Sequence, residues 1–327
     1  MTSGLKRQRS SSPETYLDSS STKSKKLKLL ASHALASPFP DFARPSAEES
    51  YEVHKILSTE HPDVIPSRVA LTTSNNSAKT CGSVPNVLES LIGTILSQNT
   101  TGANSTAAKH SLDTRFGKNN FEAIATAAKA EVVDAIRMGG LANKKAGVIQ
   151  AILRQVKQRY GKYSLQHLTG TIEGDGDSED VGGSQDEKGK FKETTNEDAM
   201  KELVSYDGVG PKTASCVLLF CLGRPSFPVD THVFRLSKLL GWVPSKSDRV
   251  TAQAHLDLKV PDELKYGLHV LMVAHGRRCK GCKAGNGTKG TCVLKLWCRE
   301  RKVVNTTEQE AADTVPTPAE ILDDEAG

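Results

Sequence analysis

The stretch that decides the fold runs from Asp198 to Pro244 and reads DAMKELVSYDGVGPKTASCVLLFCLGRPSFPVDTHVFRLSKLLGWVP. A short helix is predicted to end near Tyr206, followed by a hairpin turn over residues 208–210 and a second helix from about Pro211. Proline at the first helical position and glycine in the turn are favoured there for backbone reasons alone. Because two glycines leave the backbone N–H groups of the turn unobstructed, this hairpin can approach an anion, and a phosphate is the natural guest.

Two motifs in this stretch carry a resemblance to a known family. Gly208–Ala214 reads GVGPKTA, and Val229–His232 reads VDTH. Together, in this order and spacing, they resemble the helix-hairpin-helix DNA glycosylases, specifically the endonuclease III family. The resemblance extends over roughly residues 85–300, through LSQNT at 96–100 and GLANKKA at 140–146.

The resemblance implies a catalytic pair, Lys212 and Asp230. In that family the motif lysine attacks the sugar carbon that bears the damaged base, and the motif aspartate assists this step. An amine can displace a base and then hold the sugar as an imine, from which the 3′ phosphate leaves by β-elimination. A carboxylate can stabilise positive charge on the sugar and relay protons. Asp230 is also a suitable N-cap for a helix over Thr231–Leu240, and the two roles are compatible.

The resemblance also implies contacts with DNA. Gln98 matches the family glutamine that fills the space left by a flipped nucleotide, since a base inside a duplex is inaccessible to the enzyme. A helix-terminal polar cap is the alternative for Gln98. His232 is expected to be a structural partner rather than a proton shuttle. The hairpin residues expected to bind DNA are Gly208, Val209, Gly210 and Thr213.

Four cysteines near the C-terminal end have the pattern C-x2-C-x9-C-x5-C, just after a His-Gly-Arg element at 275–277. They are Cys279, Cys282, Cys292 and Cys298. The family usually carries C-x6-C-x2-C-x5-C around a [4Fe–4S] cluster, which needs four thiolates, so the resemblance implies such a cluster. Lys289 stands where the family has a cysteine, and Cys282 would have to substitute. Zinc, which also accepts four thiolates, is the alternative, and a loop without metal is the third.

Hydrophobic periodicity predicts helices upstream of the hairpin. From Val87 the apolar residues Leu88, Leu91, Ile92, Ile95 and Leu96 repeat at the spacing of one buried helix face. Further helices are predicted at Gly102–Phe116, Phe121–Ala128, Lys129–Met138 and Lys144–Tyr160. A Gly139-Gly140 break and Asn143 as a cap would precede the last of these.

These patterns predict an all-α, two-lobed helix-hairpin-helix glycosylase fold with a cysteine-rich metal loop. Residues 85–223 form the helical domain that contains the hairpin. Residues 46–84 together with 224–302 form the second lobe. The cleft between the lobes is expected to hold Lys212 and Asp230, because sites are favoured at domain interfaces.

Three segments are expected to lie outside this fold. Residues 1–45 have too few apolar side chains to offset the entropy of ordering and are predicted to be a disordered basic arm. An acidic, glycine-rich insertion at 171–195 and an acidic tail at 303–327 are predicted to be disordered as well. Basic clusters at 6–9 and 23–26 resemble a bipartite nuclear import signal, and a basic arm that only adds affinity for nucleic acid is the alternative.

The charge of the 327-residue chain is divided unevenly along the sequence. The net charge is +5, but residues 51–170 sum to +6 and 200–304 to +10, whereas 171–199 and 305–327 each sum to −7. The positive charge of the segments expected to be ordered favours binding of a polyanion such as nucleic acid. No apolar run approaches the ~18 residues of a membrane span, and the N-terminus has no secretory h-region. The seven cysteines therefore suggest metal or core thiols rather than disulfides, with Cys216 and Cys221 in the core.

The resulting prediction is a monomeric nuclear DNA glycosylase of base excision repair with apurinic/apyrimidinic lyase activity. It acts on double-stranded DNA through a lysine Schiff base, with oxidised pyrimidines as the expected substrate. Residues 227–244 also look like the plant 5-methylcytosine glycosylases, and mismatch-specific thymine glycosylases share the same frame. The rival class is a non-catalytic DNA-binding protein, which would need the hairpin glycines but not Asp230.

Overall fold

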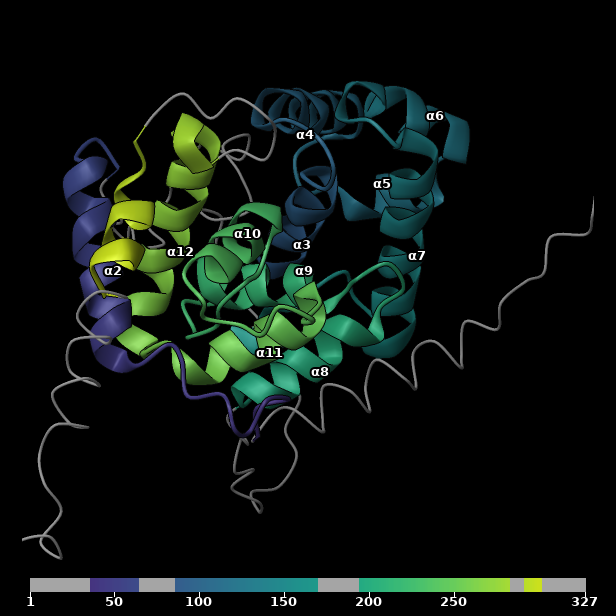
Figure 1. The fold of residues 1–327 in the computed structure, drawn as a ribbon. Coiled ribbons are helices and arrows are strands. Elements are labelled where there is room, and N and C mark those ends of the chain that lie inside the picture. Colours follow the sequence, from purple (N-terminus) through teal and green to yellow (C-terminus); the bar gives the residue numbers. More distant parts are fainter. Residues whose placement is uncertain (1–35, 65–85, 170–193, 283–290, 302–327) are drawn as a thin grey trace, which may run out of the picture.

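The computed structural model of the chain describes residues 36–64, 86–169, 194–282 and 291–301. Over these ranges the secondary structure is helical, with no β-strand. The helices form two groups, each around its own hydrophobic core, and α3, α9 and α10 lie where the groups meet (Figure 1). The prediction of an all-α, two-lobed fold is confirmed. No helix in these ranges is both long and apolar enough to cross a membrane.

The first lobe follows the chain from residue 86 to 222. Its longer helices are α3 (Val87–Leu96), α4 (Gly102–Phe116), α5 (Phe121–Thr126), α6 (Lys129–Ala135), α7 (Ala142–Tyr160), α8 (Asn196–Ser205) and α9 (Pro211–Cys216). Short turns complete it: η1 (Arg137–Gly139), η2 (Gln166–Thr169) and the π-helical η3 (Val217–Cys221), which continues α9.

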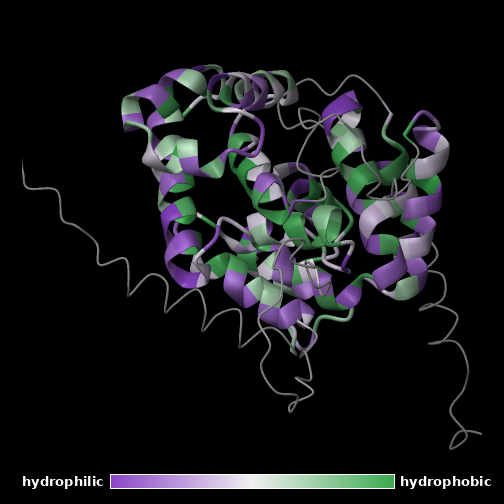
Figure 2. Ribbon diagram, turned by 180° about the vertical axis from the view of Figure 1, so that it is seen from behind, coloured by the Kyte–Doolittle hydropathy of each residue, from purple (hydrophilic) through white to green (hydrophobic). Residues whose placement is uncertain are grey.

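The core of the first lobe is built around α3. The Asn86 side chain caps this helix by accepting a hydrogen bond from the Glu89 backbone N–H, which otherwise lacks a partner. The five apolar residues of the predicted face are at most 1% exposed. Burying one such side chain is worth about 1.5–3 kcal/mol, so this face fixes where α3 lies. Figure 2 shows hydrophobic residues gathered on the faces that the helices turn toward one another.

The second lobe joins the N-terminal α2 (Ala47–Glu60) to the C-terminal part of the chain. Its other elements are α10 (Thr231–Leu239), α11 (Arg249–Lys259), α12 (Asp262–Arg278), the turn η4 (Lys280–Cys282) and a helical segment over 293–301. α2 packs along α12, although the two are far apart in sequence (Figure 1). Their shared core contains Leu57, Phe227, Trp242 and Met272, none of them solvent-exposed.

Most predicted helix bounds agree with the structure, with one instructive exception. α4 has the predicted bounds, and α5 and α6 end two or three residues early. α7 begins at Ala142 with Leu141 as its N-cap, in the left-handed region at φ 50°, and no side chain caps it. Asn143 therefore lies inside the first turn, and its prediction as a cap is wrong.

Residues 36–45 differ from the disordered arm predicted for residues 1–45. Ser37 Oγ lies 2.6 Å from His255 Nδ1, and Phe39 and Phe42 pack edge-on against the same imidazole. Two aromatic rings on one buried histidine of α11 supply the apolar contact that composition alone does not reveal.

Several predictions fall outside the described residues. They are the basic clusters at 6–9 and 23–26, nearly all of the acidic insertion, and the acidic tail.

Candidate active site

The predicted hairpin is present between α8 and α9. Gly208 adopts φ +81°, and a Cβ at this position would lie 2.7 Å from the Val148 methyl groups of α7. Val209 is fully buried in the core of the first lobe. Gly210 is the N-cap of α9 in extended conformation, and a Cβ there would meet no atom within 4 Å. The two glycines therefore differ: packing requires Gly208, whereas Gly210 leaves open space in front of the helix.

Lys212 and Asp230 line the same cavity, which has a volume of about 920 Å³. Lys212 is the second residue of α9 in the first lobe, and Asp230 directly precedes α10 in the second. Both side chains are half-buried. The volume lies within the range of about 300–1,000 Å³ that small-molecule sites occupy.

Asp230 holds the N-terminus of α10. Its Oδ1 accepts hydrogen bonds from the backbone N–H groups of His232 and Val233, each 2.8 Å long. The N-cap role considered for Asp230 is therefore present, and these bonds also fix the carboxylate in the cavity wall. The His232 ring packs against α12, where a Cβ on Gly276 would lie 2.7 Å from His232 Cβ.

The segment before Asp230 is held by two helices of the second lobe. From α11, Gln253 Oε1 accepts the Val229 N–H at 3.2 Å, and Asp257 accepts the Phe227 N–H. Burial raises the pKa of Asp257, and the Lys265 ammonium, 3.8 Å away, opposes that rise. From α12, His269 Nδ1 lies 2.9 Å from the Pro228 carbonyl oxygen.

His269 is buried in the cavity wall beside both members of the predicted catalytic pair. Burial lowers its pKa to about 4, while the Asp230 carboxylate raises it and the Lys212 ammonium lowers it further. The imidazole is therefore neutral at pH 7. Since a carbonyl only accepts, Nδ1 carries the proton, and Nε2 keeps an acceptor lone pair.

Gln98 also lines the cavity, just after α3. Its Nε2 donates a 3.1 Å hydrogen bond to Thr213 Oγ1, which joins this wall to the hairpin helix. The buried Lys145 of α7 braces the same loop, because its ammonium donates to the carbonyl oxygens of Leu96 and Gly139 at 2.8 and 2.7 Å. Thr213 is itself only 5% exposed, so its role is to position Gln98 rather than to contact a ligand directly.

The rim of the cavity is basic. Arg249, Arg277 and Arg278 line it, and all three side chains are exposed. Arg278 forms an ion pair with Asp63 at 2.7 Å. This rim suits a ligand with phosphate groups at its edges.

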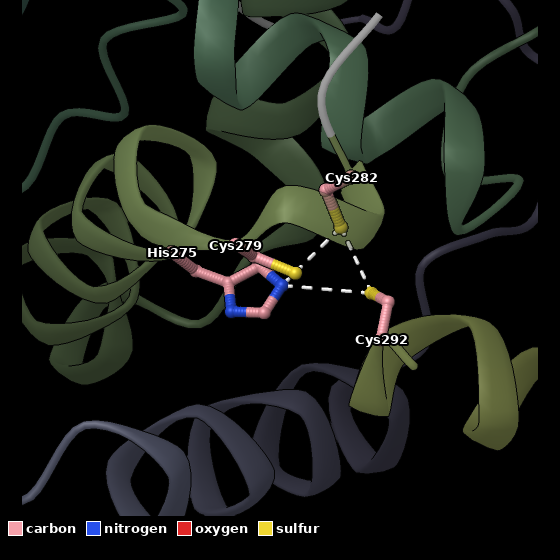
Figure 3. A group of neighbouring side chains, drawn as sticks. All are labelled: His275, Cys279, Cys282 and Cys292. Carbon is pink, nitrogen blue, oxygen red and sulfur yellow. Dashed lines mark hydrogen bonds between the residues drawn. The ribbon is translucent and has the colours of Figure 1, made fainter. Parts of the chain in front are cut away.

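The cysteine loop brings together a set of side chains that differs from the predicted one. His275, Cys279, Cys282 and Cys292 place one ligand atom each within 4.8 Å of one another (Figure 3). Cys282 Sγ and Cys292 Sγ lie 2.8 Å apart. The hydrogen bond between them raises the pKa of Cys282 and lowers that of Cys292. Cys298 does not belong to this group, and its Sγ lies 3.6 Å from the Leu239 carbonyl oxygen.

Sequence reasoning missed three residues of this region. Gln253 and His269 carry no local motif, and only their contacts with the Asp230 segment mark them. His275 carried a usable signal, since it precedes Cys279 by four residues and these positions share one face of a helix.

Comparison with known proteins places the chain among DNA repair proteins. Residues 92–261 match the family described as HhH-GPD superfamily base excision DNA repair protein. An Arabidopsis thaliana protein provisionally named a DNA glycosylase is 36% identical over 262 residues, covering 75% of this chain and 81% of that protein. Endonuclease III of Sulfolobus acidocaldarius is 29% identical over 219 residues, covering 67% of this chain and 84% of that enzyme.

A solved structure shares the fold. The trapped covalent intermediate of an endonuclease III with DNA superimposes with a TM-score of 0.55 and 23% identity, covering 79% of this chain and 97% of that one. The described helices therefore adopt the endonuclease III fold.

Proposed function

This chain belongs to the HhH-GPD superfamily of base excision DNA repair proteins, and we propose that it is a DNA glycosylase with apurinic/apyrimidinic lyase activity. The observation that supports the proposal is that Lys212 from the first lobe and Asp230 from the second line one cavity, with His269 in its wall. A protein that only gripped DNA would need the hairpin but no carboxylate in the same cavity as the lysine.

Lys212 supplies the nucleophile. After the Lys212 ammonium has lost a proton, its Nζ lone pair attacks C1′ of the target nucleotide while the C1′–N bond breaks and the base leaves with that electron pair. Loss of a proton and opening of the sugar ring give an imine, which draws electrons from C2′ as its proton is removed. The C3′–O bond then breaks and the 3′ phosphate leaves, which is the lyase step.

Asp230 and His269 assist from the second lobe. The carboxylate stabilises the positive charge that develops on the sugar as the base departs, and it can relay protons. The neutral His269 adds no positive charge beside the amine.

DNA is bound by both lobes in this proposal. The open face of Gly210 admits a phosphate to the backbone N–H groups at the start of α9, with Gly208 and Val209 shaping the turn. Gln98 fills the duplex where the target nucleotide is flipped out, held from behind by Thr213. The arginine rim contacts flanking phosphates and makes affinity steeply dependent on salt.

The finer parts of the proposal come from the sequence. We propose double-stranded DNA carrying an oxidised pyrimidine or an abasic site as substrate, a monomeric enzyme, and nuclear localisation. Thymine mismatched with guanine and 5-methylcytosine are the competing substrates. A panel of duplexes, each bearing one of these lesions at the same position, separates them by rate of excision.

The Cys/His group is a candidate metal site, and the occupant predicted from the sequence is a [4Fe–4S] cluster. That cluster would take Cys279, Cys282, Cys292 and Cys298 as ligands. The described arrangement does not fit that set, because His275 takes the fourth place. No step of the proposed reaction runs through the metal.

Covalent capture tests the proposal. Borohydride reduces an imine to a stable amine, so it should link the native protein to DNA that contains an abasic site. Lys212→Ala should lose this adduct and strand cleavage. Lys201→Ala is the matched control, because Lys201 is 45% exposed on α8 and pairs with Glu197 outside the cavity.

Two results would contradict parts of this assignment. Full trapping by Lys212→Ala would remove the lysine from its role. Base release without any imine would retain the glycosylase and eliminate the lyase.

A further inference from the structure

The Cys/His group of the second lobe has the dimensions of a site for a single metal ion. His275 Nε2 lies 3.3 Å from Cys282 Sγ and 3.6 Å from Cys292 Sγ. Around a tetrahedral Zn²⁺ with bonds of about 2.3 Å to sulfur and 2.0–2.1 Å to nitrogen, neighbouring ligand atoms are about 3.5–3.8 Å apart. Cys282 Sγ and Cys292 Sγ, 2.8 Å apart, would need to separate by about 1 Å.

A [4Fe–4S] cluster requires a different arrangement of its ligand atoms. Each of its four thiolates binds a different iron atom, so the sulfur atoms surround the whole cluster and stand farther apart than ligands that share one ion. The four ligand atoms here lie within 4.8 Å of one another. The sulfur of Cys298, the fourth cysteine, is 3.6 Å from the Leu239 carbonyl oxygen.

The helix that carries two of the ligands orients them toward one point. His275 and Cys279 are four residues apart at the end of α12, where the Cys279 N–H bonds the His275 carbonyl oxygen at 2.8 Å. The turn η4 brings in Cys282, and Cys292 comes from the start of the segment at 291–301. Figure 3 shows all four side chains directed at the space between them.

A neighbouring histidine supports His275 as a ligand. His61 Nε2, at the end of α2, lies 2.9 Å from His275 Nδ1. If Nδ1 donates to His61, Nε2 keeps its lone pair for the metal, and ligating histidines are commonly oriented by such a bond. Both imidazoles are buried, with His275 fully so.

We propose that His275, Cys279, Cys282 and Cys292 bind one structural Zn²⁺ in a Cys3His site, and that Cys298 is not a ligand. Three thiolates and one imidazole in a closed tetrahedron are the chemistry of a structural zinc site. The ion would join α12 to the segment at 291–301, with α2 held through His61. The inference rests on this geometry and not on the proposed enzyme activity.

The decisive experiment compares two variants of the full chain. Native protein, His275→Ala and Cys298→Ser are each produced with both iron and zinc supplied, purified without oxygen, and analysed for metal per chain. We expect about one zinc and no iron in the native protein and in Cys298→Ser, and a loss of zinc in His275→Ala. A [4Fe–4S] cluster predicts the reverse: iron in the native protein, and its loss in Cys298→Ser.

Two further measurements keep the test valid if His275→Ala fails to fold. Co²⁺ bound to the native protein should give the intense visible bands of a tetrahedral thiolate site, unchanged in Cys298→Ser. His61→Ala, which leaves all four ligands in place, should weaken zinc affinity by about 10–100-fold. A brown native protein with iron, a protein without metal, or zinc loss in Cys298→Ser would each overturn the proposal. Borohydride trapping, measured separately on each sample, reports the enzyme activity.

Discussion

At the scale of single residues, the two hairpin glycines have different physical reasons to be glycine. Gly208 needs the left-handed backbone and has Val148 against it, whereas Gly210 is extended and faces open space. Since no neighbour in the fold requires glycine at position 210, a ligand that approaches the hairpin from outside would explain it. Substitutions at these two glycines can therefore separate an effect on folding from an effect on DNA binding.

Gly208→Ala should destabilise the fold, and Gly210→Ala should weaken DNA binding. The first forces a Cβ to within 2.7 Å of Val148 in a strained conformation, so unfolding free energy should fall by about 2–4 kcal/mol. The second should change stability by less than about 0.5 kcal/mol. Its affinity for abasic DNA should fall about tenfold, as expected for one lost contact with a charged phosphate. Equal affinity of Gly210→Ala and native protein would show that no phosphate approaches there.

Two substitutions separate the helix-capping role of Asp230 from the role of its negative charge. Asn and Asp cap helices about equally well, so Asp230→Asn should keep the native melting temperature. Its base excision rate should fall by about 10²–10⁴-fold, because the carboxylate is gone. Asp230→Ala should lose the rate and, in addition, about 1 kcal/mol of unfolding free energy. Normal excision by Asp230→Asn would leave the residue with a capping role only.

At the scale of elements, α11 and α12 hold the segment that positions Asp230, the proposed catalytic carboxylate. The backbone of Phe227–Val229 is held by Gln253, Asp257 and His269, none of which belongs to a contiguous motif. The position of Asp230 thus depends on side chains that follow it in sequence by 23 to 39 residues.

Gln253→Ala should impair the reaction without impairing DNA binding. It leaves the buried Val229 N–H without its partner, which should cost about 1–3 kcal/mol of stability and loosen Asp230. The excision rate should fall, while the Kd for abasic DNA stays near the native value. Leu258→Ala, on the exposed face of the same helix, is the control. A parallel loss of affinity and rate would indicate damage to the whole lobe.

At the scale of the whole molecule, buried histidines make stability depend on pH. Burial lowers the pKa of His54, His255 and His269 from 6.5, with His269 at about 4. Between these values the unfolded chain binds protons that the folded chain does not. Folding therefore gains stability above pH 6.5 and loses it as the pH falls toward 4.

Acidification from pH 6.5 to 4 should therefore lower the unfolding free energy, with His269 contributing at most about 3 kcal/mol. Urea unfolding across this range measures the slope. His269→Asn should flatten the profile, whereas the same change at the exposed His110 should leave it as in the native protein. An unaltered slope in His269→Asn would mean that this imidazole is already protonated in the folded chain.

The helices could be predicted from the sequence because their signals are local, and the two residues of the proposed catalytic pair were found through equally local motifs. The apolar face of α3 repeats at helical spacing, and Lys212 and Asp230 lie inside contiguous motifs. The cap of α7 was mispredicted because Leu141, left-handed after Gly139-Gly140, begins that helix without a side-chain cap.

The sequence by itself thus determined an all-α chain, its hairpin, and the lysine and aspartate on which the proposed chemistry depends. Only the tertiary structure decided which side chains meet them: His269 beside the pair, Gln253 behind Asp230, and His275 in place of Cys298 in the cysteine loop. The reason is physical. Spacing along a chain encodes which face of one helix a residue occupies, whereas the neighbours of that face are set by how distant helices pack.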